Sequence, residues 1–181
     1  AGTVTWVPDA DGLWTTATNW SSTPALPGSG DDVVVNVAGD RAITLSSGTQ
    51  SIKSLNSSEQ ILISGSVNTV LQVGSTAQLN NTLTMTRGTL LGGTYNMSAQ
   101  GSIVALGGTF DGVTVNGPVN VSGNPGQLNV NNGMTLNGTM SVGDVVGTLY
   151  GRVTFGSSGV PGTLAGTGTV GIPAVPVIIL Q

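Results

Sequence analysis

Hydrophobic and polar residues alternate with a period of two along most of the chain from Val33 onward. Short runs such as VVVNV, ILISG and MTLNG are separated by Gly or by Asn-Gly, and no stretch has the spacing of an amphipathic helix. This alternation predicts β-strands with one buried face, and the Gly and Asn residues predict tight turns. We therefore expect an all-β protein.

A repeat within the chain favours a parallel β-solenoid, or β-helix, over a β-sandwich. Residues 88–97 (GTLLGGTYNM) align with residues 108–116 (GTFDGVTVN), twenty positions later and with one deletion, and residues 133–140 form a weaker copy. Stacked coils place like residues on like residues and so repeat in sequence, whereas sandwich strands seldom do. The expected fold is a solenoid with coils of about 20 residues, and a β-sandwich is the alternative.

The same alternation assigns side chains to the interior and residues to the corners. Left-handed corner positions are expected at Asn116-Gly117, Asn132-Gly133 and Asn137-Gly138, where stacked Asn side chains can form ladders. The residues expected to face inward are Leu83, Met85, Leu90, Tyr95, Met97, Ile103, Phe110, Val113, Val115, Val119, Val121, Leu128, Val130, Met134, Leu136, Met140 and Val142.

We expect three regions within one domain: a Trp-rich N-terminal cap over residues 1–32, the solenoid over residues 33–171, and an apolar tail over residues 172–181. The two ends of a solenoid expose unpaired backbone groups, so each end needs a cover or a partner. The tail is expected either to add as a donor strand to the next subunit or to fold back over its own last coil. Its assembly residues are Val175, Val177, Ile178, Ile179 and Leu180.

All three tryptophans lie near the N-terminus, at Trp6, Trp14 and Trp20. The first interpretation is that these large side chains plug the open apolar end of the solenoid. The second is a carbohydrate-binding platform, in which the indoles stack on sugar rings while Asp9 or Asp11 accepts hydroxyl hydrogen bonds. Exposed indoles that respond to polysaccharide would favour the second interpretation.

The few charged residues exclude some partners and favour few sites. Only four Lys and Arg residues are present, they are scattered, and the net charge is −4, so we expect no nucleic-acid binding. The longest apolar run, residues 175–180, is far shorter than the roughly 20 residues of a membrane span, so we expect no membrane insertion. Asp9-Ala10-Asp11-Gly12 resembles the start of a calcium loop, but the Glu that completes an EF-hand loop is missing. We expect no cofactor, with calcium at Asp9 and Asp11 as a weak alternative.

Catalysis has little support in the sequence. The chain has no His and no Cys, which removes the common nucleophile-base pairs and the metal sites built on them. Asp111 and Asp144 are the remaining candidate acid pair, of the kind used to cleave sugars, but their Gly neighbours suggest turns. Thr82, Thr84 and Thr86 have the spacing of an ice-binding face, yet Asn, Ser and Val replace Thr in equivalent positions, so β-propensity explains them better. We expect no enzymatic activity.

The first 55 or so residues contain a distinctive series of motifs: Trp6, Asp11-Gly12-Leu13-Trp14, Asn19-Trp20, Pro27-Gly28, Asp31-Asp32-Val33-Val34-Val35 and the following ITLSSGTQSIKSLN. This series resembles the opening of the β-strand-repeat modules of large secreted bacterial surface proteins, both autotransporter-like and filamentous-haemagglutinin-like. The resemblance implies a parallel β-solenoid that is secreted to the bacterial cell surface and serves in structure or adhesion. The chain is short for that family and ends in an unusual apolar segment.

Together these observations predict a secreted, extracellular, non-catalytic structural protein. Its solenoid subunits are expected to associate head to tail into a self-assembling cell-surface filament, or to form a segment of an adhesive stalk. The alternative is a carbohydrate-binding module that uses Trp6, Trp14 and Trp20 to bind a polysaccharide.

Overall fold

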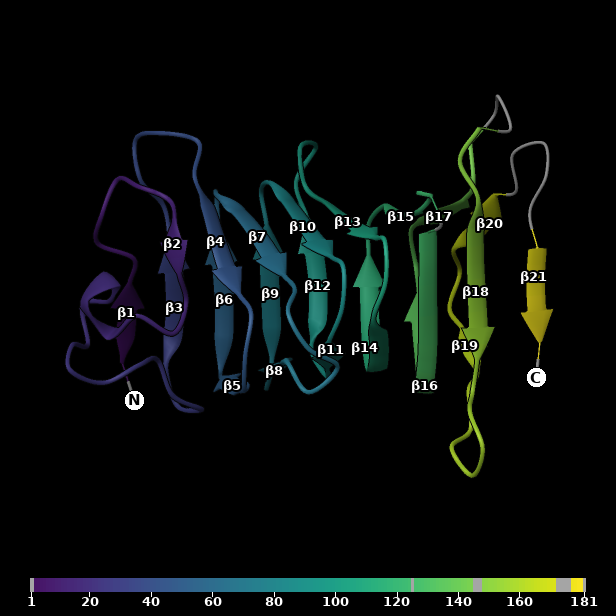
Figure 1. The fold of residues 1–181 in the computed structure, drawn as a ribbon, viewed down its shortest axis with the longest axis horizontal. Helices are drawn as coiled ribbons and strands as arrows, with labels where there is room; N and C mark the ends of the chain where they lie inside the picture. The colour runs from purple at the N-terminus through teal and green to yellow at the C-terminus, as the bar shows by residue number, and fades with distance from the viewer. Residues whose placement is uncertain (1, 125, 145–147, 172–176, 181) are drawn as a thin grey trace.

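The computed structural model describes residues 2–124, 126–144, 148–171 and 177–180 of the chain. It is a parallel β-solenoid of about 6 turns with about 21 residues in each turn. Figure 1 shows the coils stacked along the long axis of the molecule, with the N-terminus at one end and the C-terminus at the other. The predicted fold class is confirmed. Because the paired strands of successive coils all run parallel, the β-sandwich alternative is not favoured.

Within the described residues, the strands form two sheets of 13 and 8 strands, and they present three faces. The eight-stranded face contains β2 (Gly12–Leu13), β4 (Ala42–Leu45), β7 (Gln60–Ile63), β10 (Thr82–Met85), β13 (Ser102–Ala105), β15 (Val119–Val121), β17 (Thr139–Val142) and β20 (Thr169–Gly171).

The 13-stranded sheet supplies the other two faces. The Thr/Asn face contains β1 (Thr3–Thr5), β3 (Asp32–Val35), β6 (Ser54–Ser57), β9 (Thr76–Leu79), β12 (Thr94–Met97), the second halves of β14 (Thr109–Asn116) and β16 (Gly126–Leu136), and β19 (Leu164–Ala165). The tail face contains β5 (Thr49–Ile52), β8 (Val70–Val73), β11 (Thr89–Leu91), the first halves of β14 and β16, β18 (Gly151–Phe155) and β21 (Val177–Leu180).

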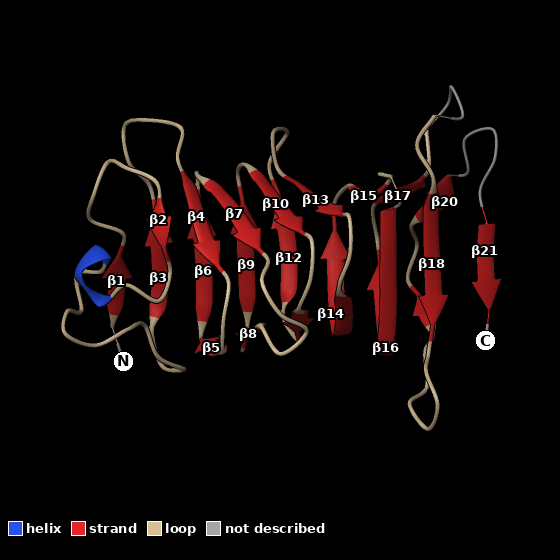
Figure 2. Ribbon diagram, in the orientation of Figure 1, coloured by secondary structure: helices blue, strands red, loops and turns tan. Residues whose placement is uncertain are grey.

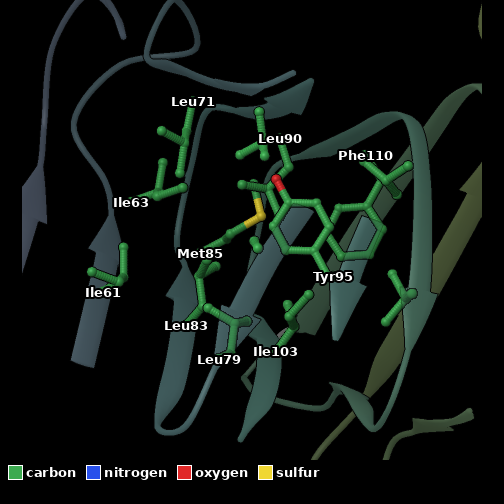
Figure 3. Packing of buried hydrophobic residues seen from close by; sticks show 14 of the residues in the cluster. Ile61, Ile63, Leu71, Leu79, Leu83, Met85, Leu90, Tyr95, Ile103 and Phe110 are labelled. Carbon is green, nitrogen blue, oxygen red and sulfur yellow. The ribbon is translucent and has the colours of Figure 1, made fainter. Parts of the chain in front are cut away.

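The interior is a continuous apolar core filled by alternate residues of every coil. Figure 3 shows part of this core, where Met85, Leu90 and Tyr95 of one turn pack between Leu71 of the turn before and Phe110 of the turn after. Every residue predicted to face inward is buried except one. The exception is Met97, the last residue of β12, which is half-buried and packs against the edge of the core.

The predicted offset of twenty residues between the two copies of the repeat is confirmed, but the predicted one-residue deletion between them is wrong. Leu90 pairs with Phe110, and Tyr95 pairs with Val115, each twenty residues later, so nothing is deleted between the two copies. The irregularity lies one coil further on. Asp111 pairs with Asn131, twenty residues later, but Val113 pairs with Met134, twenty-one later. The additional residue is Asn132, which forms a β-bulge with a left-handed φ of 53°.

The corner prediction is correct at one of three Asn-Gly pairs. Asn132 and Gly133 both have positive φ, whereas the backbone at Gly117 and Gly138 lies outside the left-handed region. Gly138 is needed for a different reason, because a Cβ there would overlap the carbonyl oxygen of Gly117 in the preceding coil.

The predicted Asn ladder is present on the Thr/Asn face. Asn116 donates through Nδ2 to Asn96 Oδ1 at 2.7 Å, and Asn137 donates to Asn116 at 2.8 Å. Each amide therefore ties one coil to the next outside the core, in addition to the backbone ladder.

Tyr95 places a polar atom in the apolar interior. The side chain is fully buried, and its hydroxyl has no hydrogen-bond partner among the described residues. Burial also raises the pKa of this phenol well above its ordinary value. An unpartnered buried hydroxyl is destabilising, since it gives up its bonds to water without replacement.

We predict that Tyr95→Phe raises the free energy of unfolding by about 1 kcal/mol, because it removes that unpartnered hydroxyl and keeps the ring. Urea unfolding of both proteins measures the difference. Tyr95→Ala is the matched comparison and is expected to cost about 3–5 kcal/mol, because it leaves a cavity. A clear loss of stability in Tyr95→Phe would contradict the account and indicate that the hydroxyl has a partner.

Candidate functional site

The three tryptophans form one buried cluster at the N-terminal end of the solenoid. Trp6 is 3% exposed, and Trp14 and Trp20 are 0% exposed. The Trp6 and Trp20 ring centroids lie 5.0 Å apart in an edge-to-face arrangement, and those of Trp14 and Trp20 lie 4.8 Å apart. The indole N–H of Trp20 donates to the backbone carbonyl of Trp14 at 2.7 Å. The cluster closes the end of the apolar core, which is the arrangement that a plug requires.

The segment that carries Trp20 also covers the outer edge of β1. The backbone N–H of Ser21 donates to the carbonyl of Thr5, and the N–H of Val7 donates to the carbonyl of Asn19, both at 2.9 Å. The Ser21 hydroxyl accepts the N–H of Thr5 at 2.9 Å. The short 3-10 helix η1 (Ala17–Asn19) holds this segment in place, and Figure 2 shows it beside β1. Outward-facing backbone groups of Thr5 and Val7 are therefore already satisfied within the chain.

This burial bears directly on the sugar-platform interpretation. Stacking on a sugar requires an indole face that is open to solvent, and none of the three tryptophans offers one in this structure. Among all Trp, Tyr and Phe side chains of the described residues, only Tyr150 is exposed, at 54%.

The acidic residues of the N-terminal segment bind the next coil rather than each other. Asp9 Oδ1 lies 2.9 Å from Arg41 Nε and accepts the backbone N–H of Gly39 at 3.0 Å. Asp11 Oδ1 accepts the N–H of Ala42 at 3.0 Å. In the part of the chain that the structure describes, no group of three or more metal-ligating His, Cys, Asp or Glu residues is found. Asp9 and Asp11 thus fasten the cap to the loop that precedes β4.

Three carboxylates around this end have lowered pKa values. The hydrogen bond from Arg41, followed by that from the Gly39 N–H, lowers the pKa of Asp9. The backbone N–H groups of Gly28 and Gly2 lower the pKa of Asp31. The Ser54 hydroxyl and the Lys53 ammonium group lower the pKa of Asp32. Each carboxylate is stabilised in its charged form, because it accepts hydrogen bonds that the protonated form cannot keep.

Glu59 is a structural residue that sequence reasoning missed. It is only 4% exposed, and its two carboxylate oxygens accept the backbone N–H groups of Val37 at 3.2 Å and Arg41 at 2.9 Å. These bonds hold the loop that carries Arg41 toward Asp9. Its only signal in the sequence is that it is the sole Glu of the chain, and its partners are backbone groups that leave no side-chain pattern.

The candidate acid pair is engaged in local contacts. Asp111 lies in β14 and accepts the side-chain amide of Asn132 at 2.7 Å. Asp144 follows β17 and accepts the backbone N–H of Thr148 at 2.9 Å. Both carboxylates are therefore engaged in hydrogen bonds within the chain, Asp111 to the following coil and Asp144 to Thr148.

The C-terminal end differs from the N-terminal end. Val153 pairs with Ile178, so the tail strand β21 adds in parallel to β18 of its own chain. The assembly residues Val177, Ile178, Ile179 and Leu180 form this strand, whereas Val175 lies outside the described residues. Within the described residues, no strand pairs with the outer edges of β19, β20 or β21. Leu164 is 44% exposed, and it lines a groove with Leu136 and Val170. This end therefore presents open strand edges and uncovered apolar side chains.

Comparison with protein-family models, with curated proteins and with solved structures found no match to this chain. The likeness to bacterial surface modules thus rests on the N-terminal residues quoted above. In the part of the chain that the structure describes, no helix has the length and apolar character needed to cross a bilayer.

We predict that Trp20→Ala lowers the free energy of unfolding by about 3–5 kcal/mol, because it opens a cavity at the end of the core. Val7→Ala is the control: Val7 belongs to the same segment but is 58% exposed, so its replacement is expected to change stability by less than about 0.5 kcal/mol. Denaturant unfolding followed by far-ultraviolet circular dichroism measures both. Equal small effects would show that the tryptophan cluster does not support the fold.

We also predict that Asp9→Asn lowers stability near neutral pH and has little effect in strong acid. The folded pKa of Asp9 is lowered, so its contribution is present above the unfolded pKa, about 4, and is lost as the pH falls through the folded value. Urea midpoints at about pH 7 and about pH 2 measure the difference. The same gap at both pH values would contradict this assignment.

Proposed function

We propose that this chain is a non-catalytic, extracellular structural protein, a rigid solenoid segment of an adhesive stalk or surface filament that joins its neighbour through its C-terminal end. The observation that carries the proposal is the difference between the two ends. At the N-terminal end three buried indoles plug the core and the outward backbone groups of Thr5 and Val7 are bonded, although β5 has a strand neighbour on one side only. At the C-terminal end β19, β20 and β21 have no strand on their outer edges among the described residues, and no aromatic cluster closes the described core. Open strand edges add further strands readily, since main-chain hydrogen bonds require no special sequence.

The stalk segment is favoured over a head-to-tail filament. In such a filament the C-terminal edge of one subunit would pair with β1 of the next. The outward backbone groups of Thr5 and Val7 already bond to residues 19 and 21, so the cap would first have to open. A contact made through the C-terminal end alone requires no such rearrangement.

The alternative of a carbohydrate-binding module built on Trp6, Trp14 and Trp20 is less well supported. Those indoles would have to leave the core before a sugar could reach them. Removing large aromatic side chains from a packed interior costs several kcal/mol, on the order of 3–5 each.

We predict that Leu164→Asp abolishes self-association of the purified protein and that Leu13→Asp does not. The two leucines are matched, because both are partly exposed, at 44% and 47%, and they lie at opposite ends of the solenoid. Association through the C-terminal end buries only Leu164, and a buried unpaired carboxylate is strongly unfavourable. Negative-stain electron microscopy and light scattering at rising concentration measure the particle length, alongside a chain ending at Gly171.

The length of the particles distinguishes a pair joined at the C-terminal ends from a head-to-tail filament and from a single subunit. Rods of twice the subunit length that disappear in Leu164→Asp support a joint between C-terminal ends. Long filaments that both substitutions prevent would instead establish head-to-tail stacking. Single rods at every concentration, from all the proteins, would contradict self-association.

A further inference from the structure

Three departures from the regular coil meet at one place on the solenoid. The first is the bulge at Asn132, a non-Gly residue with a positive φ of 53°. The second is the connection between β18 and β19, residues 156–163, where the equivalent connection between β11 and β12 has only Gly92 and Gly93. The third is a groove at the surface, lined by Gly112, Thr114, Asn132, Gly133, Thr135 and Thr163 among others. Insertions and bulges in a repeat fold gather where the fold binds something.

The long connection is bonded directly to the bulge. The backbone N–H of Asn132 donates to the carbonyl of Pro161 at 2.7 Å, and that of Met134 donates to the carbonyl of Thr163 at 2.8 Å. This brings the Thr163 hydroxyl over Gly133, where an added Cβ would lie 2.7 Å from that oxygen. Because Gly112 and Gly133 carry no side chains, the surface is hollowed beside them.

The groove offers several uncommitted hydrogen-bonding groups. Among the described residues, no partner is found for the hydroxyls of Thr114, Thr135 and Thr163 or for Oδ1 of Asn132. Hydroxyls both donate and accept, and the amide oxygen accepts. The exposed Ala165 adds a small apolar surface at the groove, and the core residues Val113 and Met134 lie beneath it. Next to the bulge, Asn131 Oδ1 is also buried without a partner.

The groove carries no charged side chain, which favours a neutral ligand over an anionic one. No lining residue carries a charge, and the nearest carboxylate in the network, Asp111, accepts the Asn132 amide. A site without a cation, on a chain of net charge −4, disfavours phosphate and other anions. A sugar residue, which presents several hydroxyl groups and small apolar faces, matches the hydroxyls, the amide oxygen and the Ala165 side chain that line the groove.

A row of threonine residues continues from the groove along the axis of the solenoid. Thr114 and Thr135 continue a register row that includes Thr76 and Thr94 on the Thr/Asn face. Coils repeat every 4.7–4.9 Å or so, which is similar to the length of one sugar residue in an extended chain. A polymer lying along the axis would meet equivalent hydroxyls at successive coils, and many weak contacts would add up.

We propose that the groove at Gly112, Asn132, Gly133 and Thr163 binds one sugar residue of a neutral polysaccharide that lies along the Thr/Asn face. This site is separate from the tryptophan cluster. The inference deepens the adhesive function proposed above and rests on it for the biological role of binding.

The test is a titration of the full-length ¹⁵N-labelled protein with cellohexaose, xylohexaose and mannohexaose, with hexagalacturonate as an anionic comparison. We expect saturable shifts of backbone amide resonances from residues 111–114, 131–135 and 163–167 with at least one neutral hexasaccharide, and none with the anionic one. Asn132→Gly keeps the left-handed backbone but removes the amide, and Thr163→Val keeps the shape but removes the hydroxyl. Each is expected to weaken binding about fivefold, the effect of losing one hydrogen bond.

Thr89→Val is the matched control, since Thr89 is a partly buried outward threonine on the tail face, and it is expected to bind like the unaltered protein. Unchanged resonances elsewhere in the spectrum show that each variant is folded. The proposal is overturned if no neutral hexasaccharide gives saturable shifts, or if Asn132→Gly and Thr163→Val bind as well as Thr89→Val. Such a result leaves the structural function standing, because that function is tested separately by particle length and the Leu164→Asp substitution.

Discussion

The whole structure depends on the parallel backbone ladder between successive coils. Each strand satisfies its N–H and C=O groups only by pairing with the coil before it and the coil after it. The interior follows from the same register, because pairing Leu90 with Phe110 or Leu83 with Ile103 stacks apolar side chains on one another along the axis. The amide ladder through Asn96, Asn116 and Asn137 repeats this principle at the surface. The stability of the solenoid is therefore approximately the sum of the contacts that each coil makes with its two neighbours.

A stack of this kind always has two ends, and in this chain the two ends are covered in different ways. At the N-terminal end the tryptophan cluster closes the core, residues 19–21 cover β1, and Asp9 and Arg41 tie the cap to the second coil. At the C-terminal end the tail strand only adds another rung to the tail face. The proposed stalk segment rests on this combination of a regular middle and two unequal ends. The bulge at Asn132 adds a local feature that the stacking itself does not require.

Regular features of the fold could be predicted from the sequence, and features made by single contacts could not. The offset of twenty residues, the inward-facing set and the Asn ladder all arise from a pattern that each coil repeats, so two copies suffice to reveal them. Met97 follows the alternation and pairs with buried Leu79, but it lies at the end of its strand and is therefore only partly covered. Glu59 and the cover of β1 involve backbone partners, which carry no residue type to recognise. The hollow at Gly133 depends on a residue thirty positions away, Thr163, that only the folded chain brings near.

The direction of the backbone ladder also decides how the rod responds to force. Hydrogen bonds between coils run along the long axis, so tension applied between the two ends pulls on them directly and does not shear one strand past another. Such bonds break one rung at a time, and each lost coil of about 21 residues releases up to about 70 Å of extended chain. The solenoid would therefore lengthen in steps under load, beginning at the C-terminal end, because the ion pair and the buried indoles add contacts to the N-terminal end beyond its backbone ladder. In the stalk segment proposed above, the C-terminal end would then be the part that extends under load and the N-terminal end the part that stays folded.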